Sequence, residues 1–166
     1  IVTKGAPSKR WGHTMVWTGK EMIVWGGGNT SKVLNDGGRY SPTRDSWRPV
    51  STDGAPSPRG SHVSVWTGKE MIVWGGRARE ASDSADYFEN GARYNPETDT
   101  WKPMSTIGAP KGRVITTAVW TGTEMVLWGG VNAAQDDGGR YISTGARYNP
   151  ATDTWTEITT KGALSP

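Results

Sequence analysis

One eleven-residue segment occurs three times in the chain and constrains its fold more than any other feature. The segment WTGKEMIVWGG begins at Trp17, returns unchanged at Trp66, and returns as WTGTEMVLWGG at Trp120. The copies begin 49 and then 54 residues apart. A repeat of this length, with a short apolar hairpin and a double glycine, is typical of a supersecondary unit that is stacked against copies of itself.

Nine of the ten tryptophans occupy three fixed positions of the repeat, which marks them as core residues. These positions are Trp17/Trp66/Trp120, Trp25/Trp74/Trp128 and Trp47/Trp101/Trp155. Trp11 alone lies outside the pattern. The 23 glycines and 10 prolines of the 166-residue chain are typical of many short strands joined by tight turns.

Each unit contains four short segments, which in the first unit are residues 13–17, 22–26, 37–40 and 46–50. The first two are nearly continuous in apolar, β-branched and tryptophan residues, the pattern of strands covered on both faces. A short glycine-containing turn joins them. No stretch has the 3.6-residue apolar period of a helix. The sequence therefore predicts an all-β chain with one four-stranded antiparallel sheet in each unit.

Sheets with two apolar faces can cover one another by stacking radially, as the blades of a β-propeller do. The double glycine and the Tyr and Trp that follow it (Tyr40/Trp47, Tyr94/Trp101, Tyr148/Trp155) resemble the kelch repeat. So does the approach Arg10-x-x-His13, which returns at Arg59 and His62, whereas the third copy has Arg113 but Thr116. The resemblance covers the whole chain and implies three kelch-type blades.

We expect a single propeller segment over residues 1–166, with blades at about 5–50, 54–104 and 108–158. Propellers close with about four to eight blades, so three blades leave an open arc with two apolar end faces. The simplest closure is a homodimer that forms a six-bladed ring.

The two ends of the chain leave an alternative open. Residues 158–165 repeat residues 1–8, so that residues 159–166 overlap the start of a fourth repeat. In a closed ring, one head and one tail would compete for the same path. The alternative is that the chain is an excerpt of a longer kelch protein.

Loops that vary in length on a rigid scaffold are the usual place for binding. Antiparallel strand order puts residues 28–36, 77–90 and 131–144 on the same side as the connections between units. The candidate contact residues in the two longer loops are Arg77, Arg79, Tyr87, Phe88, Asp136, Asp137 and Tyr141. The alternative is that the aromatic residues among them pack the loops against the blades.

Arg10, Arg59 and Arg113 occupy one register, just before the first strand of each unit. If that strand is innermost, as the kelch resemblance implies, the three arginines ring the channel mouth and attract carboxylates, phosphates or an acidic peptide. In kelch domains that bind peptides, arginines at this approach often make the contact. The alternative is that each arginine bonds loop carbonyls of its own blade.

Several kinds of chemistry are disfavoured by the composition. The chain has no cysteine, which removes thiolate metal sites, cysteine nucleophiles and the Tyr–Cys cross-link of oxidases that resemble galactose oxidase. His13 and His62 occupy the same register of different blades, so they do not converge on a metal. We expect no metal, no cofactor and no catalytic residue.

Charge and hydrophobicity limit the classes of partner that the chain can have. The net charge is only +3 and the basic residues are spread through every repeat, so we expect no nucleic-acid binding. We expect neither a signal peptide nor a membrane-spanning run in these residues, and the sequence does not indicate a compartment.

Three functions remain open. The first, which we favour, is a non-catalytic scaffold that self-associates and binds a protein or an acidic peptide. The second is a structural half-propeller without a ligand. The third is an enzyme or carbohydrate binder that acts in the channel, in the manner of the sialic-acid epimerases that share the kelch fold. The fold alone does not choose among them.

Overall fold

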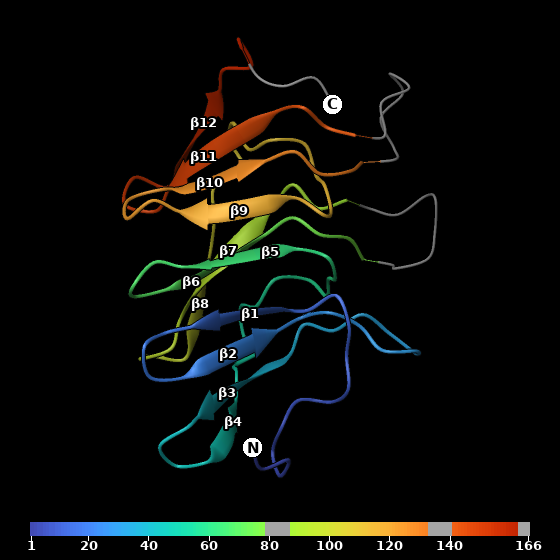
Figure 1. Ribbon diagram of the computed structural model, residues 1–166, viewed down its shortest axis with the longest axis vertical. Helices are drawn as coiled ribbons and strands as arrows, with labels where there is room; N and C mark the ends of the chain where they lie inside the picture. Colours follow the sequence, from blue (N-terminus) through green and yellow to red (C-terminus); the bar gives the residue numbers. More distant parts are fainter. Residues whose placement is uncertain (79–86, 133–140, 163–166) are drawn as a thin grey trace.

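The strands of a computed structural model, which describes residues 1–78, 87–132 and 141–162, form three four-stranded antiparallel sheets (Figure 1). The first sheet contains β1 (Thr14–Trp17), β2 (Met22–Trp25), β3 (Gly37–Ser41) and β4 (Ser46–Pro49). The second contains β5 (Val63–Trp66), β6 (Met71–Trp74), β7 (Gly91–Asn95) and β8 (Thr100–Pro103). The third contains β9 (Thr117–Trp120), β10 (Met125–Trp128), β11 (Gly145–Asn149) and β12 (Thr154–Ile158).

The prediction of an all-β chain with one such sheet per unit is confirmed. The described residues form no helix, and hence none that is long and apolar enough to cross a membrane. The strands of each sheet are neighbours in chain order. We call the three sheets blades 1, 2 and 3.

A threonine closes the hairpin between the first two strands of every blade. In blade 1 the Thr18 backbone N–H donates to the Glu21 carbonyl at 3.0 Å, and the Thr18 hydroxyl accepts the Glu21 N–H at 2.9 Å. Thr67 and Thr121 make the same two bonds in the other blades. The repeated Trp-Thr-Gly sequence is therefore a turn signal, in which the hydroxyl satisfies a backbone donor.

The double glycine allows the chain to pass close to the segment that precedes each blade. Gly27 has φ of 82°, and a Cβ placed there would lie 2.6 Å from the Trp11 carbonyl oxygen. A Cβ on Gly26 would lie 2.6 Å from the ring of His62 in the next blade. Any larger residue would therefore push the blades or the loop apart.

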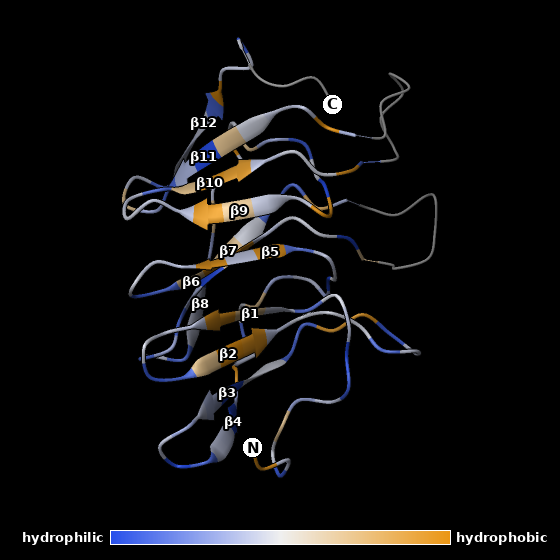
Figure 2. Ribbon diagram, viewed as in Figure 1, coloured by the Kyte–Doolittle hydropathy of each residue, from blue (hydrophilic) through white to orange (hydrophobic). Residues whose placement is uncertain are grey.

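The core consists of two layers, each between neighbouring blades. The layer between blades 1 and 2 centres on Trp25, whose ring lies 5.2 Å from that of Trp101. The layer between blades 2 and 3 repeats it with Trp74 and Trp155 at 5.5 Å. Trp25 and Trp74 are fully buried. Strand β5 contacts both β1 and β9, which makes the first strand of each blade the innermost one. In Figure 2 the apolar colours gather on strands such as β1, β2 and β9.

An aspartate in the last turn of each blade fastens the segment that leads into that blade. Asp99 has φ of 54°, and its carboxylate accepts bonds from the Tyr94 hydroxyl and from the Ser51 N–H, the latter at 3.0 Å. The Trp101 indole N–H donates to the Ser51 carbonyl at 2.8 Å. The same bonds recur around Asp45 and Asp153. Aspartate suits this place because it tolerates a positive φ and accepts two bonds.

We expect Asp99→Ala to lower the free energy of unfolding by about 2 kcal/mol, since it removes both bonds and leaves an alanine in the left-handed region. Asp99→Asn should lose about half as much, because asparagine keeps an acceptor and tolerates that conformation. Urea titration measures both. Glu97→Ala, an exposed substitution in the same turn, is the control; equal losses for Asp99→Ala and Glu97→Ala would rule out this role.

Candidate functional site

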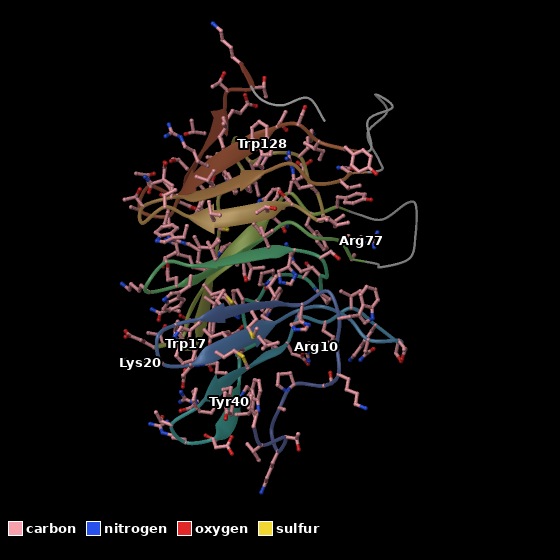
Figure 3. All side chains as sticks on the ribbon, viewed as in Figure 1. Arg10, Trp17, Lys20, Tyr40, Arg77 and Trp128 are labelled. Carbon is pink, nitrogen blue, oxygen red and sulfur yellow. The ribbon has the colours of Figure 1, made fainter. Side chains whose placement is uncertain are left out.

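The two ends of the strands carry different structures. On one side lie the tight turns that contain Thr18 and Lys20. On the other side, the loops between the second and third strands meet the connections between blades. Figure 3 shows Trp17 and Lys20 at the opposite side from Arg10 and Arg77. Backbone bridges join each loop to its connection: Trp11 with Gly28, Gly60 with Arg77, and Val114 with Val131. We call this side the loop face; its described residues are 28–36, 77–78, 87–90, 131–132 and 141–144, with connections 8–12, 57–61 and 111–115.

The three arginines of the common register hold the loops of their own blades. The Arg59 guanidinium donates to the carbonyls of Gly75 and Asn90 at 3.0 and 2.9 Å and to the Asn90 side chain at 2.8 Å. Arg113 repeats this pattern with the carbonyls of Gly129 and Thr144 at 3.1 and 2.9 Å. Arg10 does so with Gly26 and Asp36, both at 3.1 Å, and adds an ion pair with the Asp36 carboxylate at 2.8 Å.

Burial decides what these arginines can do. Arg59 and Arg113 are each only 1% exposed, and burial lowers the pKa of both guanidinium groups to about 10. They remain charged at neutral pH, and backbone carbonyls take up their donors. This is the bracing arrangement, in which the guanidinium donors of Arg59 and Arg113 are directed to their own loops.

The candidate contact residues of the long loops fall into three groups. Phe88 packs on the guanidinium of Arg59, whose Cζ lies 4.2 Å from the ring centre, so Phe88 helps to anchor its loop. Arg77 and Tyr87 are half-buried and share a backbone bridge. Tyr141 is 71% exposed. Arg79, Asp136 and Asp137 lie outside the described residues.

Two exposed apolar residues on the loop face were not among the sequence candidates. Trp11 is 51% exposed and Ile115 is 76% exposed. Ile115 also has φ of 54°, a conformation that β-branched residues rarely adopt. Trp11 is the one tryptophan outside the repeat, which was an available signal, whereas nothing in the local sequence marked Ile115 as exposed.

The concave surfaces lie on both sides of the blades. A pocket of about 590 Å³ on the loop face of blade 3 is lined by Tyr141, Lys111 and Arg113 among others. A larger groove of about 750 Å³ lies by the tight turns of blades 1 and 2, between Trp17, Lys20 and Lys69. The sequence did not indicate this groove.

The inner wall of the arc is formed by the first strand of each blade. Strands β1, β5 and β9 carry no acidic or basic residue. A shallow hollow of about 300 Å³ there is lined by small, apolar and hydroxyl side chains and by His62. His62 is 5% exposed and packs between blades, as expected for a core histidine. Within the described part of the chain, no three His, Cys, Asp or Glu residues gather as a metal site would require.

Comparison with known proteins agrees with the repeat and the blades. A family model described as the KLHDC2/KLHL20/DRC7 Kelch-repeats domain matches residues 1–166. No curated protein matches the chain significantly. Kelch-repeat domains are generally non-catalytic scaffolds for protein interaction. Because the match covers the full length and the three sheets have the expected strand order, this chain belongs to the kelch-repeat family.

Proposed function

We propose that this chain is a non-catalytic scaffold that binds a protein or peptide on its loop face, in a six-bladed ring completed by a second copy. The observation that carries the binding proposal is the set of apolar side chains exposed on that face: Trp11, Ile115 and Tyr141. Large aromatic side chains that stand exposed on a rigid frame are the usual anchors of a protein interface.

The described ends of the loops are held in place for a physical reason. They are joined by backbone bridges, and an arginine from the preceding connection donates to both ends of the loop. A partner that docks on these ends would lose little free energy in ordering them, which favours affinity. The arginines thus support the surface from below, and an acidic ligand would be attracted by exposed Lys9 and Lys111 instead.

The self-association proposal rests on the end faces of the arc. Trp17 and Met15 of blade 1 are 54% and 58% exposed, and Val119 of blade 3 is 55% exposed. The residues that correspond to them at covered blade surfaces pack in the core layers: Trp66 and Trp120 for Trp17, and Val16 and Val65 for Val119. Two arcs of three blades give a ring of ordinary size, with residues 1–166 of each chain as one propeller segment.

Selection of a phage-displayed random peptide library against the protein tests the binding proposal. We expect enriched peptides whose affinity falls about tenfold or more with either Trp11→Ala or Tyr141→Ala, measured by calorimetry on the synthesised peptide. The control is Lys20→Ala with Lys69→Ala, beside the groove at the tight turns, which should leave affinity unchanged. If no peptide is enriched, or if only the control weakens binding, the loop face is not the binding surface.

A further inference from the structure

The contacts between neighbouring blades have a direction, which can be extended to the ends of the arc. In both core layers, the earlier blade supplies the same positions, Val16/Val65, Ile23/Ile72 and Trp25/Trp74. The later blade supplies a different set, Met71/Met125, Tyr94/Tyr148 and Trp101/Trp155. We call these the leading and the trailing surface of a blade. Blade 3 has an uncovered leading surface, and blade 1 an uncovered trailing surface.

A polar pair between blades 1 and 2 shows that the two surfaces are matched residue by residue. The Thr14 hydroxyl on the leading surface lies 2.7 Å from Nε2 of His62 on the trailing surface. The edge of the His62 ring meets Trp25, with centres 5.3 Å apart. The Thr14 hydroxyl gives this buried ring nitrogen a hydrogen-bond partner, which offsets the free-energy cost of removing the nitrogen from water.

In the layer between blades 2 and 3, both positions of this pair are occupied by other residues. Val63 stands at the position of Thr14, and Thr116 stands at the position of His62. Thr116 turns its hydroxyl to the Trp128 carbonyl of its own blade, at 2.9 Å. Threonine on the leading surface thus occurs with histidine on the trailing surface, and valine occurs without it.

The uncovered surfaces carry the matched form of this pair. Thr117 of blade 3 occupies the position of Thr14, with Trp128 at the position of Trp25. His13 of blade 1 occupies the position of His62. A threonine and a tryptophan on one open end and a histidine on the other form the set that the interface between blades 1 and 2 uses.

A second set of side chains, the arginines of the third strands, also reaches from the leading surface of one blade to the next blade. The Arg39 guanidinium donates to the Tyr94 hydroxyl of the next blade at 3.4 Å, and Arg93 donates to the Pro150 carbonyl of the next blade at 2.6 Å. Their side chains are 10% and 8% exposed, whereas that of Arg147, in the same register of blade 3, is 49% exposed. Its counterpart on the trailing surface of blade 1 is Tyr40, in the register of Tyr94.

We propose that the leading surface of blade 3 packs on the trailing surface of blade 1 of a second copy, with His13 against Thr117 and Trp128, and Arg147 against Tyr40. This inference rests on the proposed self-association and adds its direction and its contacts. Packing like surfaces together would bring two Arg147 side chains to one interface and leave His13 without its threonine. Two such contacts close a ring of six blades, whereas a third copy would exceed the usual number.

Analytical ultracentrifugation of three proteins tests the direction. The wild type should sediment at twice the 18.0 kDa chain mass. Val119→Glu on the leading surface and Trp17→Lys on the trailing surface should each be monomeric, with dissociation constants raised at least 100-fold. An equal mixture of the two variants should recover a dimer. One interface of the mixed dimer is native, and the other places the introduced glutamate against the introduced lysine, which attract each other. Ile107→Glu, at a residue 86% exposed between blades 2 and 3, is the control and should stay dimeric.

The other possible results distinguish an incorrect contact from an absence of self-association. If either Val119→Glu or Trp17→Lys alone remains dimeric, or if the mixture stays monomeric, the directional contact is wrong while self-association stands. A monomeric wild type would refute self-association, and the peptide selection would still test the loop face. Unfolding in urea verifies that both variants fold, as expected for half-exposed positions.

A double-mutant cycle tests the histidine pair itself. His13→Thr and Thr117→Val should each weaken the dimer about tenfold, and the double variant should recover most of the loss, since it recreates the layer between blades 2 and 3. Strictly additive losses would show that His13 and Thr117 do not meet.

Discussion

Arg59→Met should lower the free energy of unfolding by about 3 kcal/mol or more, the largest effect that we expect of any single substitution outside the tryptophans. Methionine fills much of the volume but has no donors, so the buried Gly75 carbonyl would lose its arginine partner and the Asn90 carbonyl would keep only the Gly75 N–H. Removal of a buried charge offsets part of this loss. Urea unfolding followed by tryptophan fluorescence measures the change.

Arg59→Lys separates the charge of this residue from its geometry. Lysine keeps the charge but offers it as a single point, which cannot reach carbonyls on two sides as a planar guanidinium does. We therefore expect a loss of about 2 kcal/mol. Arg44→Met, at an exposed position, should change stability by less than about 0.5 kcal/mol.

The same variants decide between bracing and ligand contact for the arginine register. If a variant of Arg59 kept wild-type stability and lost only peptide binding, Arg59 would be a ligand contact. The triple substitution of Arg10, Arg59 and Arg113 would then abolish binding in a folded chain. We expect instead that the triple variant fails to fold, since each arginine holds both ends of a loop.

The second large effect is an acid sensitivity located at His62. Burial, together with the nearby Arg59 and His13, lowers the pKa of His62 to about 3. The unfolded chain therefore binds a proton at this residue below about pH 6.5, while the folded chain does not. The stabilisation is complete above that pH and is lost as the pH falls toward 3. Between pH 7 and 4.5, this residue alone should cost about 3 kcal/mol.

A matched variant isolates that contribution. Thr14→Val with His62→Thr reproduces the pair that already exists between blades 2 and 3, so it should fold. Because it lacks the buried imidazole, its stability should fall less between pH 7 and 4.5 than that of the wild type, by about 3 kcal/mol. His62→Thr alone should be less stable than the double variant at pH 7, because it leaves the Thr14 hydroxyl unpaired. Identical pH profiles for the wild type and the double variant would refute a role for His62.

Much of the fold could be predicted from the sequence, because the same pattern occurs three times and predicts the same sheet each time. The Trp-Thr-Gly turn and the double glycine each reflect a local backbone requirement. The strand limits differed from the prediction by about one residue, for example at Ser41, where strand pairing depends on the facing strand.

The candidate site was predicted less well, because exposure is not a local property. Tyr141 and Phe88 are both aromatic residues of long loops, yet one is exposed and the other lies against a buried arginine. Trp11 and Ile115 became candidates only when the structure showed that both stand free of the core. What separates these residues is the path of the loop around them.

By itself, the sequence determined the number of blades, the four strands of each and the positions that face a neighbouring blade, because a repeat of fixed register places equivalent side chains on equivalent surfaces. Only the tertiary structure decided which charges are open to a partner. Arg59 finds its acceptors 16 and 31 residues away, where the loop returns to the blade, and this closure directs its donors to the loop. The contacts of His62 likewise exist only where two blades meet, and from them the match between the open ends of the arc could be inferred.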